Sequence, residues 1–125
     1  MNQESIFNIS SSAEFETVAL EVFRHQYQNT PVYSDFCRFL KKDLTTVRTF
    51  RDIPFLPIEF FKTHKVLSNA MKPQAVFTSS GTTGQSASKH LVGDISLYEQ
   101  SFHWAFKRFY GEPEEWVILA LLPSY

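Results

Sequence analysis

The sequence predicts an α/β fold in which helices pack on an incomplete sheet. Apolar side chains recur at helical spacing over residues 12–29 and 95–110. Short apolar stretches at residues 75–78 and 89–92, and the uninterrupted run "WVILALL" at residues 116–122, are typical of strands. A run as apolar as residues 116–122 indicates a buried strand with neighbours on both sides. Because only one short hairpin precedes it, we expect its faces to be covered by another chain, through self-association for example, or left partly exposed.

The composition is that of a folded chain no larger than one domain. Of the 125 residues, 43% are hydrophobic and 16% are aromatic, which supports a packed core and excludes a disordered chain. The 12 basic and 13 acidic residues give a net charge of −1 and form no basic patch. Proteins that bind nucleic acid or an anionic membrane surface usually carry such a patch, so we expect neither as a partner.

Three further features predict a cytoplasmic protein. Cys37 is the single cysteine, which excludes an internal disulfide and fits a reducing compartment. The N-terminal segment "MNQESIFNISSS" has no basic stretch followed by an apolar one, so no signal peptide is indicated. The longest apolar run has seven residues, which is too short to span a bilayer.

The first long helix is predicted over residues 12–29. Ser11 and Glu14 have the Ser-x-x-Glu spacing of a capping box at its start. The apolar stripe that follows consists of Phe15, Val18, Ala19, Val22, Phe23 and Tyr27.

A second helix is predicted to begin at Pro31, after an N-capping Thr30, and to end at residues 41–42. Since buried free cysteines are common, Cys37 is interpreted as a core residue rather than as a nucleophile. The apolar stripe of this helix consists of Tyr33, Phe36, Cys37 and Leu40.

The segment "RDIPFLPIEFFKTHKV", residues 51–66, predicts an extended arm with one short helical turn. Pro54 and Pro57 prevent a regular helix across them, because proline lacks a backbone N–H and restricts the residue before it. The side chains between are too apolar for an exposed loop, so we expect the arm to pack on a core. His64, near its end, is interpreted as a structural or exposed histidine rather than a catalytic one.

A hairpin and a third long helix complete the predicted elements. The strands at residues 75–78 and 89–92 enclose a loop rich in Thr, Ser and Gly. The helix covers residues 95–110 and ends at Gly111, a residue typical of helix ends.

The enclosed loop has the parts of a phosphate-binding cradle. In "TSSGTTG", Gly81 and Gly84 permit positive φ angles and a close approach of the backbone to a ligand. Backbone N–H groups in such a turn converge on an anion. A flexible linker has a similar composition, so the residues by themselves leave both interpretations open. The side chains able to donate hydrogen bonds to phosphate oxygens are Thr78, Ser79, Ser80, Thr82 and Thr83.

The stretch "FTSSGTTGQS", residues 77–86, resembles the phosphate-binding loop of the adenylate-forming superfamily, which includes acyl-CoA synthetases and luciferase-type enzymes. It does not match the common P-loop, because two residues rather than four separate its glycines. In the superfamily this loop binds the pyrophosphate portion of ATP. Ser86 and Ala87 stand where the superfamily has Pro and Lys, and Lys89 comes two residues later. Lys89 is therefore either a phosphate contact or a solvated surface lysine.

A closer resemblance covers most of the chain. The stretches "IPFLPIEFFKTHKV", "FTSSGTTG" and "HLVGDISLYEQSF" resemble the bacterial acyl-protein synthetase family, with phenylacetate–CoA ligases as relatives. Founding members of that family activate a fatty acid as acyl-AMP and pass the acyl group to one of their own cysteines. A partner reductase then receives it, in the complex that makes aldehyde for bacterial bioluminescence.

The resemblance implies that residues 1–125 are the N-terminal portion of one adenylate-forming catalytic domain, without its C-terminal lid. The expected function is ATP-dependent and Mg²⁺-dependent activation of a carboxylic acid, with a fatty acid favoured. The expected phosphate-binding residues are Thr78, Ser79, Ser80, Gly81, Thr82, Thr83, Gly84 and Lys89.

The remaining parts of that function are expected outside these residues. The metal ligand and the acceptor cysteine belong to the missing part, so Cys37 is not the acceptor and residues 1–125 alone are expected to be inactive. An acyl-CoA ligase and a non-catalytic binding module descended from such an enzyme stay open as alternatives.

Overall fold

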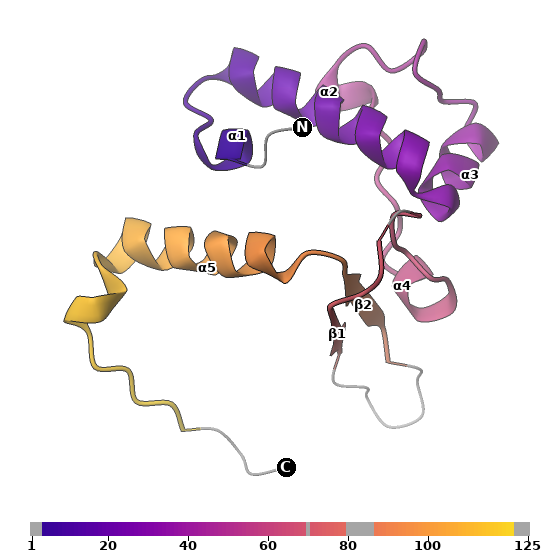
Figure 1. Ribbon diagram of the computed structural model, residues 1–125. Coiled ribbons are helices and arrows are strands. Elements are labelled where there is room, and N and C mark those ends of the chain that lie inside the picture. Colours follow the sequence, from indigo (N-terminus) through magenta and orange to yellow (C-terminus); the bar gives the residue numbers. More distant parts are fainter. Residues whose placement is uncertain (1–3, 70, 80–86, 122–125) are drawn as a thin grey trace. The chain divides into compact units, whose positions relative to one another are not determined.

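The computed structural model describes residues 4–69, 71–79 and 87–121, in two compact units (Figure 1). The first unit is Met1–Ile95 and the second is Ser96–Tyr125. Helices α1 to α4 and a two-stranded sheet belong to the first unit, and nearly all of helix α5 belongs to the second. The predicted α/β class is confirmed at this coarse level. No helix among these described ranges is long and apolar enough to cross a membrane.

Helix α2, Ser12–Asn29, follows the short helix α1, Glu4–Phe7, and has the predicted bounds. The Ser11 hydroxyl accepts a hydrogen bond from the Glu14 N–H at 3.2 Å and so caps the helix. The Glu14 carboxylate accepts from both the backbone N–H and the hydroxyl of Ser10, at 2.8 and 2.9 Å. The returning half of the predicted capping box is therefore displaced by one residue.

Helix α3, Pro31–Phe39, ends earlier than predicted. Lys41 has a positive φ of 56°. Its N–H donates to the Arg38 carbonyl, and the Lys42 N–H donates to the Cys37 carbonyl, both at 2.9 Å. These two bonds form a Schellman motif, which closes the helix. Because lysine stands where glycine is usual, the sequence did not indicate this end, and Leu40 is a half-exposed cap rather than a core residue.

The core of the first unit is small and mainly helical. Its buried apolar residues are Phe23, Tyr33, Cys37 and Val47. The rings of Phe23 and Tyr33 meet edge to face, with centroids 6.2 Å apart. Cys37 is completely buried, which confirms that it is a core residue.

The proline-rich segment is an extended arm, and Ile53 and Leu56 pack on this core as predicted, whereas Phe55 and Ile58 are exposed. It runs from the 3-10 helix η1, Phe50–Asp52, to the single turn of α4, Phe60–Thr63. The Tyr33 hydroxyl donates a hydrogen bond to the Pro54 carbonyl at 2.7 Å, which attaches the arm to α3.

The sheet is the predicted hairpin of β1, Ala75–Thr78, and β2, Lys89–Val92. The strands pair antiparallel, with Thr78 opposite Lys89 at the end where the loop departs. Helix α4 packs against β2, whereas α2 packs mainly on α3. The prediction that helices pack on the sheet therefore holds for α4, and the larger helices form their own core.

Helix α5, Ile95–Tyr110, has the predicted bounds. Gly111, with φ of 87°, follows its last residue, as predicted. The chain then forms the 3-10 helix η2, Pro113–Glu115, and the Trp116 indole N–H donates to the Tyr110 carbonyl at 2.7 Å. The indole bond holds the start of the next segment against the end of α5.

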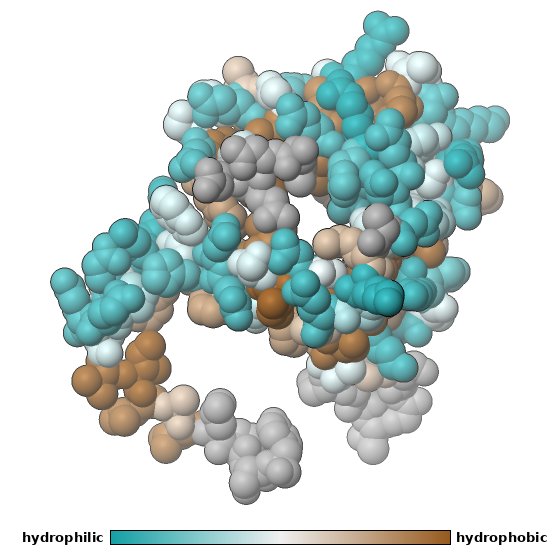
Figure 2. Space-filling view, viewed as in Figure 1, coloured by the Kyte–Doolittle hydropathy of each residue, from teal (hydrophilic) through white to brown (hydrophobic). Residues whose placement is uncertain are grey.

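The predicted buried strand at residues 116–122 is wrong for the part that the structure describes. Residues 116–121 have no regular secondary structure, and their large apolar side chains are exposed, Leu121 completely so. They form an apolar surface, coloured brown in Figure 2. A strand needs the hydrogen bonds of a neighbouring strand, and no described segment pairs with this one. The expectation that its apolar faces stay partly exposed is confirmed.

Candidate functional site

The loop end of the hairpin carries three of the predicted phosphate-binding residues. Thr78 ends β1, Ser79 follows it, and Lys89 begins β2. The phosphate-binding role of the whole set stays a prediction. The other five members lie outside the described residues: Ser80, Gly81, Thr82, Thr83 and Gly84.

Two hydrogen bonds hold the ends of the loop together beyond the last strand pair. The Ser79 N–H donates to the Ser88 carbonyl at 3.1 Å. The Ser88 N–H donates to the Ser79 hydroxyl oxygen at 3.0 Å. Since a serine hydroxyl is both donor and acceptor, Ser79 keeps its own O–H proton for a further acceptor. The loop therefore starts and ends at a fixed point, with one hydroxyl donor at that point.

Ser88 anchors this end of the hairpin to α4. It is buried, and its hydroxyl lies 3.1 Å from the Nε2 atom of His90. The His90 ring in turn stacks on the Phe61 ring, with centroids 4.7 Å apart and planes 22° from parallel. A buried hydroxyl is costly without a partner, so this contact favours one arrangement of the hairpin end.

Sequence reasoning missed Ser88 and His90. Both lie on one side of "SKHLV", two residues apart, which is the spacing of neighbours on one face of a strand. This two-residue spacing was the signal that could have identified Ser88 and His90, but the small hydroxyl residues of the loop were the more conspicuous pattern.

Thr78 and Lys89 lie on the opposite face from Ser88. Residues directly opposite in an antiparallel pair present their side chains on the same face, so the side chains of Thr78 and Lys89 project from one face of the hairpin. Both residues are exposed. A hydroxyl donor and a cation on one face at a loop entrance can bind an anionic group such as a phosphate.

The two other reactive side chains that the sequence raised are far less suited to chemistry. Burial raises the pKa of the Cys37 thiol, which disfavours the reactive thiolate. His64 is exposed, stacks on Phe60 with centroids 4.8 Å apart, and lies 2.8 Å from the Thr63 hydroxyl through Nδ1. These contacts agree with the structural or exposed role predicted for His64. Within the described ranges, no group of three or more His, Cys, Asp or Glu side chains could hold a metal ion.

Comparison with known proteins extends over most of the chain. A sequence model of the acyl-protein synthetase family LuxE matches residues 7–101, which include the arm, the hairpin and the first turns of α5. No solved structure matches.

One curated relative is similar over a shorter stretch. It is a long-chain-fatty-acid–luciferin-component ligase of Photorhabdus luminescens, 37% identical over 68 residues. The match covers 54% of this chain and 58% of the relative, so the chain spans less than two thirds of the relative's length.

Proposed function

Because the chain belongs to the LuxE family of acyl-protein synthetases, we propose that it serves the ATP-dependent activation of a fatty acid and the transfer of its acyl group to a protein cysteine. The name of the Photorhabdus relative refers to a long-chain fatty acid and supports this choice of substrate. In the proposed first step, a carboxylate oxygen attacks the α-phosphorus of ATP. The bond between the α-phosphorus and the oxygen that bridges to the β-phosphate breaks, so that acyl-adenylate forms and pyrophosphate leaves.

The observation that carries the proposal is the closed end of the hairpin. A loop that binds pyrophosphate must present its donors without reorganising as negative charge develops. The paired bonds between Ser79 and Ser88 supply a rigid start and end for such a loop. A flexible linker needs no such closure, so the hairpin favours the cradle over the linker.

The residues at the hairpin end fit a polyphosphate. Thr78 and Ser79 offer hydroxyl donors, and Lys89 offers a positive charge on the same face as Thr78. When bound, ATP with Mg²⁺ supplies the adenylyl group. In this proposal the family's metal-binding carboxylate lies outside residues 1–125, which form the N-terminal portion of one catalytic domain.

The acceptor thiol of the second step also lies elsewhere in this proposal. Cys37 is completely buried within the helical core, where neither an acyl chain nor a base can reach its sulfur. A reductase that receives the acyl group is the proposed partner, on the resemblance to synthetases of aldehyde-forming complexes.

Pyrophosphate exchange tests the first step. The intact protein should exchange labelled pyrophosphate into ATP only when a fatty acid is supplied, and residues 1–125 alone should not. Replacing Lys89 with Gln should raise the KM for ATP severalfold if Lys89 contacts phosphate, and should change nothing if it is solvated. Absence of exchange with every acid tried would indicate a non-catalytic module instead.

The acceptor is identified by the product. With labelled fatty acid, the proposed transfer gives label on the protein that hydroxylamine removes, as expected for a thioester. Soluble labelled acyl-CoA, formed only when CoA is added, would show a CoA ligase in place of an acyl-protein synthetase.

A further inference from the structure

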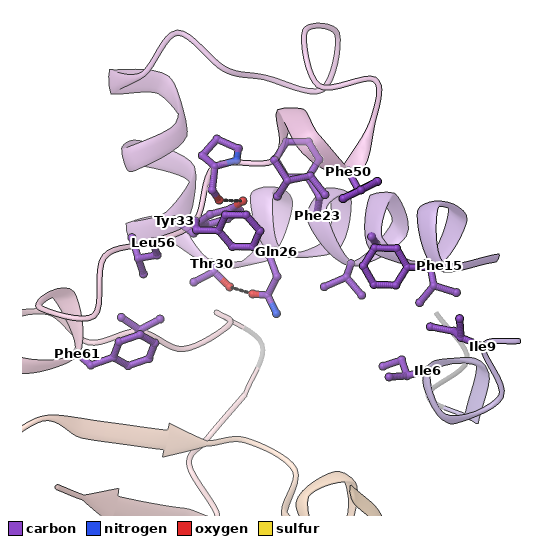
Figure 3. A pocket seen from close by; sticks show the side chains of 17 residues that line it. Ile6, Ile9, Phe15, Phe23, Gln26, Thr30, Tyr33, Phe50, Leu56 and Phe61 are labelled. Carbon is purple, nitrogen blue, oxygen red and sulfur yellow. Dashed lines mark hydrogen bonds between the residues drawn. The ribbon is translucent and has the colours of Figure 1, made fainter. Parts of the chain in front are cut away.

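An open groove of about 630 Å³ runs along α2 in the first unit (Figure 3). One end lies at Ile6, Ile9 and Phe15, and the other lies at Gln26 and Phe61. The remaining walls come from the arm and the start of α3. Its size falls within the range of small-molecule sites, roughly 300–1,000 Å³.

The groove is lined by the stripe of α2 that the sequence assigns to the core, except for Tyr27. Of that stripe only Phe23 is fully buried, and Val18, Ala19 and Val22 are half-buried. Their side chains face the groove and leave it apolar along its length. No lining residue carries a charge.

One polar group is available at the end near Phe61. The Thr30 hydroxyl donates to the Gln26 Oε1 atom at 2.6 Å, which fixes the orientation of the carboxamide. The Gln26 amide nitrogen then lies on the side away from Thr30, as Figure 3 shows. Among the residues described, none accepts a hydrogen bond from that nitrogen. The Tyr33 hydroxyl is already paired with the Pro54 carbonyl.

The same end of the groove adjoins the hairpin. Phe61 lines the groove and stacks on His90, whose Nε2 lies 3.1 Å from the Ser88 hydroxyl. Ser88 is one of the two residues that close the loop. The polar end of the groove and the base of the loop therefore share the Phe61 side chain as a common wall.

We propose that this groove binds the hydrocarbon chain of the fatty acid, with the carboxyl group at the Gln26 and Phe61 end and the tail at Ile6 and Phe15. This assignment rests on the proposed function. An apolar wall without charges suits a methylene chain, and the oriented amide NH2 group of Gln26 suits a carboxylate. An extended peptide fits poorly, because its backbone groups would find almost no hydrogen-bond partners.

The length of the groove sets an expected chain length. The eleven residue-to-residue steps from Phe15 to Gln26 span about 17 Å of helix. With C–C bonds of about 1.5 Å, an extended chain advances about 1.3 Å per carbon, so about 13 carbons fill that distance. We therefore expect acids of about 12 to 14 carbons to bind most tightly.

Equilibrium dialysis of the intact protein with labelled tetradecanoate, without ATP, tests the groove directly. Ala19→Trp places a large ring halfway along it and should lower the affinity for tetradecanoate at least tenfold. Each buried methylene contributes about fourfold to affinity. Octanoate has fewer methylenes to lose from the groove than tetradecanoate, so its affinity should fall less. Gln28→Trp is the matched control, since Gln28 is exposed and lies nine residues along α2, on the opposite side of the helix from Ala19.

A second variant keeps the test valid if Ala19→Trp does not fold. Gln26→Leu conserves side-chain size and should weaken tetradecanoate about tenfold, while tetradecanol, which has no carboxylate, should bind as before. Unchanged tetradecanoate binding and chain-length preference in both variants would overturn the assignment. So would altered self-association of Ala19→Trp with unchanged acid binding, which would identify the groove as a packing surface.

The outcome separates the two proposals. If the groove variants bind the acid more weakly than the wild type, but the wild type never exchanges pyrophosphate, the groove assignment is supported and the proposed function fails. If exchange occurs with the same chain-length preference in wild type and Ala19→Trp, the function stands and the groove assignment fails.

Discussion

The hairpin end and the α2 groove lie next to each other and are built on opposite principles. At the hairpin end, hydrogen bonds through Ser79, Ser88 and His90 hold the polar groups in place. Along α2, apolar side chains are left unpaired and border open space. The contrast implies that the hairpin is sensitive to the loss of single hydrogen bonds or of backbone freedom. The groove should instead be sensitive to changes in side-chain volume.

The largest expected effect is on the loop enclosed by the hairpin. Gly84→Val adds a branched side chain where the sequence predicts a positive φ, which costs about 1–3 kcal/mol for a strained position and hinders a phosphate. Fatty-acid-dependent pyrophosphate exchange should fall at least roughly tenfold, since about 1.4 kcal/mol of transition-state stabilisation corresponds to that factor. Thr82→Val should lose less, because it removes one donor and keeps the shape.

Urea unfolding of both loop variants is the control. Their free energy of unfolding should change little, because the loop sequence supplies no large apolar side chain to a core. Wild-type exchange in both variants would mean that the Thr/Ser/Gly loop is a linker. The hairpin end would then not be a phosphate site to compare with the groove.

The next largest effect is expected at Ser88. Ser88→Ala removes a hydroxyl hydrogen bond to the half-buried His90 Nε2 atom, and a typical intramolecular hydrogen bond contributes about 0.5–1.5 kcal/mol to stability. Urea unfolding should report that loss, and the KM for ATP should rise because the loop end is less firmly held. Ser101→Ala, an exposed serine on α5, is the control and should unfold as wild type. Equal stability of the two variants would show that the Ser88 contact does not anchor the hairpin.

A smaller effect is expected where the arm meets the groove. Tyr33→Phe removes the donor to the Pro54 carbonyl and should lower the free energy of unfolding by about 1 kcal/mol. Because side-chain volume is nearly kept, tetradecanoate binding should stay within about twofold of wild type. A large loss of acid binding in this variant would mean that hydrogen bonding, rather than volume, governs the groove as well.

The smallest effect concerns a turn outside both regions. Hydrogen bonds from the Thr45 hydroxyl, then from the backbone N–H groups of Thr45 and Thr46, lower the pKa of Asp43 to about 2. A carboxyl whose folded pKa is depressed stabilises the fold above its unfolded pKa of about 4 and loses that contribution as pH falls through about 2. Asp43→Asn should therefore flatten the acid dependence of unfolding between about pH 4 and 2. An unchanged acid profile would exclude Asp43 as a contributor.

Local signals predicted most elements to the residue. The bounds of α2, β1, β2 and α5 follow from apolar periodicity, a capping serine and a glycine stop, all of which act within a few residues. The end of α3 was missed, because its Schellman motif uses Lys41 at positive φ instead of a glycine.

Contacts between segments far apart in the chain could not be predicted from local signals. The strand expected at residues 116–122 requires a partner strand, and apolar composition does not reveal whether one is present. The stripe of α2 reads as core in sequence, yet whether it is covered depends on how the arm, η1 and α1 lie over it.

The sequence by itself determined helices α2 and α5, the hairpin, the glycine- and hydroxyl-rich loop and the family to which the chain belongs. Only the tertiary structure decided that Ser88 closes the loop, that Phe61 is shared by hairpin and groove, and that α2 keeps an open apolar face. The reason is physical: turns, caps and periodic faces depend on neighbours in the chain, whereas burial and openness depend on segments that fold back from tens of residues away.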